Sequence, residues 1–289
     1  MTPDPIRIVT VLIVAVILTG CAGLRTKTFA AMSGHGGYKP PVKIAGAIHS
    51  VGTSDIAVYL VETDAGLVLF DAAYEHMHTR IVSNIKSQGF NPQDIVVILN
   101  TQAHMDHAGG IETLRALSGA RVIASPIAAA ELRAGSRGDF SALIRLTPFT
   151  PVRAVETLTA PAVTVGSDTF YPYATPGHSK GCTTWRFETM IKGRRQTVVL
   201  VCGFQRLPFT KLDNNARYPN IKSDYLKSAD VLEGLAKDCD VLLAPHIGDF
   251  ETELTLDELS SDAGIFDGTR CTRLLTQEAA RLRRMIGMP

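Results

Sequence analysis

The sequence predicts an α/β protein in which two β-sheets pack together and helices cover their outer faces. Short β-like runs alternate with segments of helical spacing, and both halves of the chain show the same order, strands and then helix. The length of 289 residues is sufficient to bury a large core without cross-links. We find no exact internal repeat and no linker that would divide the part after the N-terminal segment into independent domains.

The N-terminal segment predicts export. Arg7 precedes the apolar run IVTVLIVAVILTG, which is short for a membrane span and ends at Cys21 with small residues on both sides. The sequence LTGC (Leu18 to Cys21) resembles a bacterial lipobox, which implies cleavage before Cys21 and lipid attachment to its sulfur; an uncleaved anchor and an ordinary secretory signal are the alternatives. We expect an export signal at 1–20, a glycine-rich lead-in at 21–41 and the folded domain at 42–289, in a periplasmic protein anchored by its lipid.

Charge and cysteine content limit the partners and the compartment. The 29 basic and 28 acidic residues nearly cancel and form no long basic run, so neither nucleic acid nor an anionic membrane surface is indicated. Membrane contact is therefore expected only through the lipid. Four cysteines remain after Cys21 in an oxidising compartment, and they contain no CxxC motif. Of the three possible pairings we favour Cys239 with Cys271 and Cys182 with Cys202.

The first half of the chain predicts a sheet followed by alternating helices and strands. β-like runs are expected at 42–51, 56–64 and 66–73, with hairpin-like breaks between them. A helix at 78–90 has Ile81, Val82 and Ile85 at helical spacing and stops at Gly89. The run DIVVILN is continuous and β-branched, as expected for a strand covered on both faces. After it we expect a helix at 110–119, a strand at 121–125 and a helix at 127–135.

The second half of the chain repeats this order of elements, strands followed by helices. β-like runs are expected at 150–158, 162–166, 182–189 and 196–204, a helix at 223–238, a strand at 241–245 and a closing helix at 271–287. The loop TPGHSKG connects two of these strands. Two segments, Phe140 to Pro151 and Phe204 to Leu212, are candidates for apolar loops that flank a cleft, or are ordinary surface loops.

The loop TQAHMDHAGG (101–110) follows the buried strand and contains four candidate metal ligands, Gln102, His104, Asp106 and His107. Zinc is usually bound by histidine nitrogen and carboxylate oxygen. These four side chains cannot all face one ion from a regular strand or helix, but a loop can divide them between two ions. α/β sheets usually place their chemistry at such strand ends.

Two isolated histidines occur in similar settings. His178 lies in a Pro/Gly turn between strands, and His246 directly follows the apolar strand VLLAP. A lone histidine is usually structural, but these two join a cluster that needs further ligands. His35, His49, His76 and His78 lack this setting, and we interpret them as structural.

These motifs together resemble a known family. AHMDHAGG is similar to the zinc signature HxHxDH of the metallo-β-lactamase superfamily, with Gln102 in place of the first histidine, and His178 and His246 fall where that family has its later ligands. The resemblance runs from about Val42 to the C-terminus. Its details are closest to subclass B3: GTSDIAVYLVETDAGLVLFD, ASPIAAAEL, SRGDF, TPGHSKGCTTW and CDVLLAPH. It implies an αββα sandwich with the site at one edge, between the sheets.

The resemblance also implies the ligands of two zinc ions. The first ion would be bound by Gln102, His104 and His178, and the second by Asp106, His107 and His246. An amide oxygen is a weaker ligand than imidazole, so we expect the first ion to bind less tightly. Alternatively, Gln102 only forms hydrogen bonds and one zinc suffices. Cys239 and Cys271 match a disulfide of the subclass.

The activity implied is hydrolysis of the amide bond of β-lactam antibiotics by a zinc-bound hydroxide that Asp106 orients. Penicillins, cephalosporins and carbapenems are all open as substrates, as is the oligomeric state. Relatives that act on lactones or thioesters usually have an aspartate that bridges the metals, and Cys202 and Gly203 stand at that strand end instead. Gly203 and Phe204 also lack the serine hydroxyl common in the subclass. Lys180 could assist a substrate carboxylate or be an exposed turn lysine. A metal-binding lipoprotein without catalysis is the remaining class.

Overall fold

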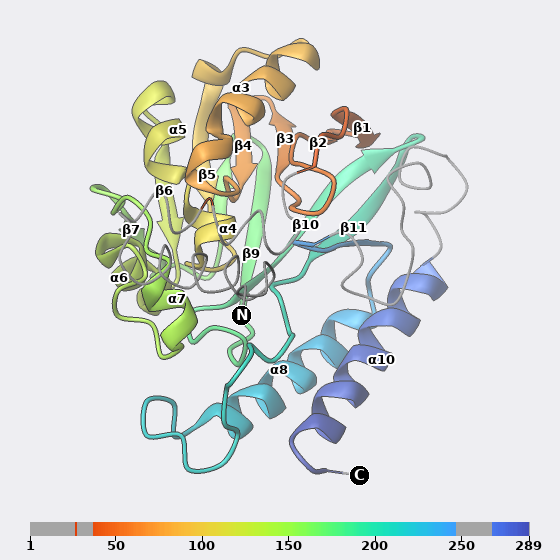
Figure 1. The fold of residues 1–289 in the computed structure, drawn as a ribbon. Helices are drawn as coiled ribbons and strands as arrows, with labels where there is room; N and C mark the ends of the chain where they lie inside the picture. Colours follow the sequence, from red (N-terminus) through yellow and green to blue (C-terminus); the bar gives the residue numbers. More distant parts are fainter. Residues whose placement is uncertain (1–26, 28–36, 247–267, 289) are drawn as a thin grey trace, which may run out of the picture.

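The computed structural model describes residues 27, 37–246 and 268–288, and these form two β-sheets with helices on both outer faces (Figure 1). The first sheet has the strand order β1 (Val42–Ala45), β2 (Ile48–Ser50), β3 (Tyr59–Thr63), β4 (Gly66–Phe70), β5 (Ile95–Leu99), β6 (Arg121–Ala124) and β7 (Glu156–Thr157). The second has the order β12 (Val241–Leu243), β11 (Arg194–Leu200), β10 (Thr183–Ile191), β9 (Asp168–Ala174) and β8 (Val163–Val165). The predicted αββα sandwich is confirmed.

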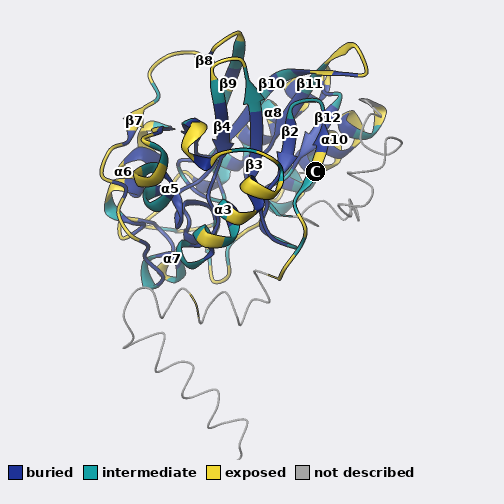
Figure 2. Ribbon diagram, turned by 90° about the horizontal axis from the view of Figure 1, so that it is seen from above, coloured by how far each residue is buried: buried dark blue, intermediate teal, exposed yellow. Residues whose placement is uncertain are grey.

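Three apolar clusters separate the layers. The first lies between the first sheet and its helices, which are α3 (His78–Ser87), α4 (Met105–Ala108), α5 (Ile111–Ser118), α6 (Pro126–Ala134) and α7 (Ala142–Leu146). The third lies between the second sheet and two long helices, α8 (Ile221–Ala236) and α10 (Gly268–Met285). Two 3₁₀ turns, η1 (Glu75–Met77) and η2 (Pro92–Asp94), flank α3. Buried residues concentrate in the sheets, and exposed ones on the outer faces of the helices and in the loops (Figure 2).

The cluster between the sheets is rich in aromatic side chains. The ring of Phe70 stacks on Phe187 with centroids 5.5 Å apart and meets Phe170 and Trp185 edge-on at 5.8 and 6.1 Å. Trp185 is fully buried, and its Nε1 donates a hydrogen bond of 3.1 Å to the carbonyl of Asn100. Because Asn100 directly follows β5, this bond ties the second sheet to the start of the loop that carries the candidate ligands.

Parallel pairing brings several strand ends to one edge. β4, β5 and β6 run parallel to one another, as do β11 and β12, so their C-terminal ends meet there. His246 follows β12 and forms an isolated antiparallel bridge with Ile56. The hydrogen bond from the Tyr59 hydroxyl to the Ala244 carbonyl, at 2.8 Å, holds the same segment against the first sheet.

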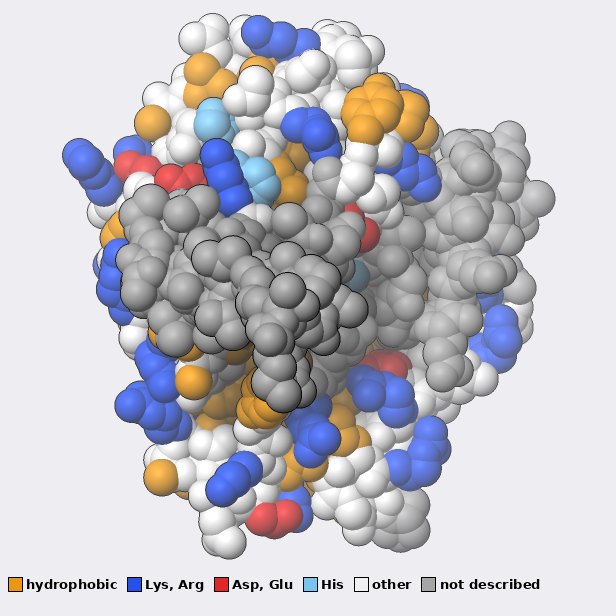
Figure 3. Space-filling view, in the orientation of Figure 1, with side chains coloured by type: hydrophobic (Ala, Val, Ile, Leu, Met, Phe, Trp, Pro, Cys, Tyr) orange, Lys and Arg blue, Asp and Glu red, His pale blue; other side chains and the backbone are white. Residues whose placement is uncertain are grey.

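Several elements differ from the sequence-based expectation: the expected run 150–158 is a strand only at Glu156–Thr157, and α4 lies within the segment expected to be a loop. The run 42–51 is two strands, because Gly46 turns the chain with φ of +52°. Strand β9 was not predicted, since Pro172 interrupts it and only Phe170 among its residues is buried, which hides the alternating pattern. Helix α7 was expected to be a loop, because five residues are too few to show helical periodicity. Around α7 the surface mixes basic and hydrophobic side chains (Figure 3).

Two disulfides connect the described elements. Cys182, just before β10, is bonded to Cys202, just after β11, with Cα atoms 5.8 Å apart. Cys239 is bonded to Cys271 at a Cα separation of 5.7 Å and thereby joins the segment after α8 to α10. Cys21 and the predicted signal lie outside the described residues. Among the helices of the described part, none is long and apolar enough to cross a membrane.

Candidate metal centre

Asp71 fixes the loop that follows β5. It lies at the end of β4 with φ of +61° and is 2 % exposed. Its Oδ1 accepts hydrogen bonds from Asn100 Nδ2 at 2.9 Å and from the Thr101 backbone N–H at 2.8 Å, and its Oδ2 accepts one from Thr101 Oγ1 at 2.5 Å. A buried carboxylate with this many donors holds the loop in one conformation.

The glycines after the loop allow it to approach the neighbouring chain. A β-carbon at Gly109 would lie 2.4 Å from the backbone nitrogen of Glu75, and one at Gly110 would lie 2.4 Å from the carbonyl of Ala72. Only glycine fits at this distance. The one-turn helix α4 therefore packs directly against the end of β4, and His104 occupies its N-cap.

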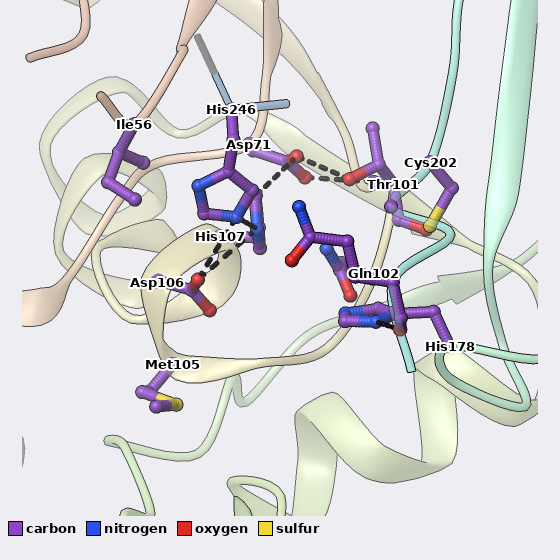
Figure 4. Close-up of polar contacts among 12 residues, drawn as sticks. Ile56, Asp71, Thr101, Gln102, Met105, Asp106, His107, His178, Cys202 and His246 are labelled. Atoms are coloured by element: carbon purple, nitrogen blue, oxygen red, sulfur yellow. Dashed lines mark hydrogen bonds and ion pairs between the residues drawn. The ribbon is translucent and has the colours of Figure 1, made fainter. Parts of the chain in front are cut away.

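Asp106, His107 and His246 form a cluster whose ligand atoms converge (Figure 4). The Nε2 atoms of the two histidines are 3.1 Å apart, and Asp106 Oδ2 lies 3.4 Å from each. Two nitrogens and a carboxylate oxygen at these separations match the donor set that zinc prefers, with room for a further ligand.

Gln102, His104 and His178 lie together in the adjacent space. The rings of His104 and His178 are 4.9 Å apart, and the amide of Gln102 points into the same space (Figure 4). Gly203 borders them: a β-carbon there would lie 3.3 Å from His178 Cδ2 and 3.4 Å from Gln102 Nε2. The structure thus brings all six candidate ligands to one edge of the sandwich, in the two groups that the resemblance implies.

The donors present fit a metal centre. Gln102 is fully buried, and neither its Oε1 nor its Nε2 has a hydrogen-bond partner in the described part of the chain. Burying an amide without partners is unfavourable by about 1–3 kcal/mol. Native proteins rarely leave such groups unpaired, and a bound ion is one of the ordinary explanations. Ligation of a metal by Gln102 Oε1 would give this oxygen the partner that the described residues do not supply.

Three candidate ligands each have one ring nitrogen turned toward a neighbouring acceptor, at hydrogen-bond distance for His178 and at ion-pair distance for His104 and His107. His107 Nδ1 lies 3.4 Å from Asp71 Oδ2, and His104 Nε2 lies 3.5 Å from Asp139 Oδ2. His178 Nδ1 donates a hydrogen bond of 2.6 Å to the carbonyl of Gln205. The other ring nitrogen of each histidine is therefore left for a metal, which is the usual arrangement around zinc.

Burial and neighbouring charges shift the pKa values of these groups in different directions. Burial would raise the pKa of Asp106, but the His107 charge and hydrogen bonds from His107 and His246 hold it well below its ordinary value. Burial would lower the pKa of His107, but Asp106 and Asp71 raise it to about 10. Burial and the charge of His104 lower the pKa of His178 to about 3. At neutral pH the metal-free cluster therefore has an anionic Asp106, a protonated His107 and a neutral His178.

Zinc binding is expected to release a proton from His107. The ion needs the unprotonated Nε2, so affinity at the Asp106 cluster should rise with pH up to about 10, by about tenfold per pH unit for this proton. Calorimetric titrations of metal-free protein in two buffers that differ in ionisation enthalpy count the released protons. Heats that are equal in both buffers after dilution correction would contradict this assignment.

Replacing Asp139 by asparagine is expected to weaken zinc binding at the Gln102 group about 10- to 100-fold, because the carboxylate orients His104. Asp139 Oδ1 also accepts a hydrogen bond of 2.6 Å from the Ser141 N–H, which an asparagine oxygen preserves. Zinc titration monitored with a competing chelator measures the change. Exposed Asp94→Asn is the matched control, and equal affinities in the two variants would refute the orienting role.

Asp71 and Asp139 lie against candidate ligands, and sequence reasoning did not single them out. Asp71 follows β4 as the ligand loop follows β5, and this shared position at a strand end was a usable signal. Asp139 lies in the SRGDF motif that carried the family resemblance, but nothing local in the sequence links it to His104, and only the fold brings the two together. Of the histidines taken as structural, buried His49 contacts Glu62 at 2.8 Å and Gln88 at 3.0 Å. His35 lies outside the described residues.

Comparisons with known proteins agree with this geometry. The family model of the metallo-beta-lactamase superfamily matches residues 51–189. The native FEZ-1 metallo-beta-lactamase from Legionella gormanii is 30% identical at a TM-score of 0.80, over 87% of this chain and 97% of that one. A Cronobacter sakazakii metallo-beta-lactamase with an HARLDQ motif is 30% identical at 0.79, over 89% and 97%. BJP-1, a subclass B3 metallo-beta-lactamase of Bradyrhizobium japonicum, is 28% identical at 0.78, over 89% and 97%.

Proposed function

The chain belongs to the metallo-beta-lactamase superfamily, and we propose from this premise that it is a zinc-dependent β-lactamase of subclass B3 type. The observation that carries the proposal is the pairing of two donor groups at one edge of the sandwich, Gln102, His104 and His178 beside Asp106, His107 and His246. We propose that each group holds one zinc ion, with the weaker ion at Gln102.

The charge of the centre favours an anionic substrate. Asp106 is the one anion among the six proposed ligands, and Asp71 and Asp139 are the carboxylates that orient the histidines. Two Zn²⁺ ions outweigh the Asp106 carboxylate and one hydroxide, so the shell of direct ligands would be cationic, while Asp71 and Asp139 lie behind it against His107 and His104. β-Lactams carry a carboxylate beside a reactive amide, so a cationic centre would attract them.

The reaction proposed is hydrolysis of the lactam amide. Bound zinc supplies Lewis acidity, which polarises a carbonyl and lowers the pKa of water. Asp106, whose side chain is 14% exposed, is placed to accept a hydrogen bond from the attacking water at the carboxylate oxygen that does not face the ligand nitrogens. Its depressed pKa keeps that carboxylate anionic, as this orienting role requires. Asp71 and Asp139 hold His107 and His104 in the tautomers that leave one ring nitrogen to the ion.

Two departures from the subclass bear on the substrate range. Gly203 contributes no hydroxyl beside His178, so any contact to water there must come from elsewhere. Cys202, at the same strand end, is held in a disulfide and supplies no bridging ligand, which argues against a lactone- or thioester-cleaving relative. Lys180, a candidate for contact with a substrate carboxylate, has its Nζ 5.2 Å from the centre of the Tyr218 ring, a cation–π contact.

A substrate panel tests the proposal. The zinc-loaded protein is offered a penicillin, a chromogenic cephalosporin, a carbapenem, an acyl homoserine lactone and a glutathione thioester, each with and without a chelator. We expect chelator-sensitive turnover of the β-lactams and little of the others. Turnover of the lactone or the thioester alone would replace the proposal by another hydrolase of the same fold.

We further propose that the chain is a periplasmic lipoprotein, with a signal at 1–20, a lipid at Cys21 and the catalytic domain at 42–289. The two disulfides support an oxidising compartment. Expression with labelled palmitate in a bacterial host tests this. Label that is absent from the wild-type protein, or retained in Cys21→Ser, would exclude lipidation at this residue.

A further inference from the structure

A cavity lies between α7 and the segment that follows β11. It has a volume of about 320 Å³, in the range of small-molecule sites. Its lining includes Phe140, Leu143, Arg145, Phe209, Lys211 and Arg217. None of the six proposed metal ligands lines this α7 pocket.

The charged side chains of the α7 pocket are all cationic. Arg145, Lys211 and Arg217 line it, and its lining contains no Asp or Glu. The one acidic residue in the adjoining segment, Asp213, pairs with Lys222 at 2.6 Å. Three cations gathered in a concave surface without a carboxylate attract an anion.

Arg145 is held in place to receive such an anion. Its Nη1 donates hydrogen bonds of 2.7 and 2.8 Å to the carbonyls of Asp139 and Phe140. Both bonds use the same nitrogen, so the remaining N–H groups of the guanidinium stay available for a ligand. A fixed guanidinium loses little entropy when it binds a carboxylate.

The apolar part of the lining suits an aromatic ring. Phe140 is 7% exposed and packs edge-on against Tyr218 at 4.9 Å, which gives the pocket a rigid aromatic wall. Phe209, by contrast, is 99% exposed and has φ of +63°, an unfavourable backbone conformation for a bulky residue. A ligand that covers this ring would bury apolar area that the fold leaves in water.

From the cations and these rings we propose that the α7 pocket binds an aromatic carboxylate, with its ring between Phe140 and Phe209 and its carboxylate toward Arg145, Lys211 and Arg217. The inference stands apart from the proposed β-lactamase activity, since it rests on residues that make no part of the metal centre. Its walls continue from segments that orient the centre, because Phe140 follows Asp139 and Pro208 lies three residues after Gln205.

Calorimetric titration of the zinc-loaded full-length protein with 2-naphthoate tests the proposal. We expect saturable binding that is at least about tenfold weaker for neutral 2-naphthamide, because the carboxylate contacts are lost. The double variant Lys211→Gln/Arg217→Gln should weaken naphthoate binding by a similar factor. Lys237→Gln/Arg273→Gln, with the same charge change at exposed positions outside the pocket, should bind as the wild type does.

A carboxylate could also bind the metal centre, and a chelator arm separates the two sites. Binding at the α7 pocket should persist after zinc removal, whereas binding to zinc should disappear. The proposal is overturned if the amide binds as tightly as the acid, if the Lys211/Arg217 variant binds normally, or if binding is lost with the metal. These outcomes are read from heats of binding, so they do not depend on whether the protein hydrolyses β-lactams.

Discussion

Asp106→Asn is expected to lower kcat/KM for β-lactam hydrolysis about a thousandfold, within the range that a positioned acid–base group contributes. The substitution preserves the size of the side chain but removes the anion that lies 3.4 Å from the ligand nitrogens of both His107 and His246. It also removes the carboxylate that we propose to orient the attacking water. Steady-state kinetics with a chromogenic cephalosporin, at zinc concentrations that saturate each variant, measure the effect.

Zinc content must be measured on the same samples, because the variant loses a proposed ligand as well as the acceptor. Asp94→Asn is the matched control, since Asp94 is exposed and directly precedes β5, the strand after which the loop with Asp106 begins. It should keep the wild-type kcat/KM. An Asp106→Asn protein that binds zinc and turns over at the wild-type rate would refute the role assigned to this residue.

The second large effect is expected at Gln102. Gln102→His should raise the affinity of the weaker zinc site about tenfold or more, because imidazole is a stronger zinc ligand than a neutral amide oxygen. Gln102→Ala should lower it further, since the alanine side chain supplies no donor. Titration of metal-free protein against a competing zinc indicator should give two steps of unequal zinc affinity for the wild type. The difference between the two affinities should be smaller in Gln102→His.

The titration also decides between the two interpretations of Gln102. A glutamine that only formed hydrogen bonds would need partners, and neither polar atom of its amide has one among the described residues. If Gln102→Ala leaves both zinc steps unchanged, Gln102 is not a ligand. Two indistinguishable steps in the wild-type protein would refute the unequal affinities.

Most of the fold could be predicted from local patterns in the sequence. β5 is a continuous β-branched run, and such a run has few alternatives to a strand covered on both faces. β9 could not be predicted in this way, because Pro172 interrupts it and its stability comes from pairing with β10. Helix α7 was missed for a similar reason: it is too short to show helical periodicity. Burial of Ile144 in the first core cluster and hydrogen bonds from Arg145 to the carbonyls of Asp139 and Phe140 stabilise it.

The candidate site was predictable where its residues share a position at strand ends. Gln102 to His107, His178 and His246 all follow strands, and the resemblance to a known family grouped them. The orienting role proposed for Asp71 and Asp139 depends on where a single carboxylate oxygen of each lies, and this is set by packing that the sequence does not display. The α7 pocket is likewise formed by two segments about 65 residues apart, each of which by itself resembles an ordinary apolar loop.

The most direct test of the central claim is cephalosporin hydrolysis by the metal-free protein as zinc is added in measured equivalents. We predict no turnover without zinc, a rise in rate as the sites fill, and loss of turnover when a chelator is added. A folded protein that binds zinc at Asp106, His107 and His246 and hydrolyses no β-lactam at any zinc concentration would contradict the proposed function. It would direct the search to other substrates of this fold.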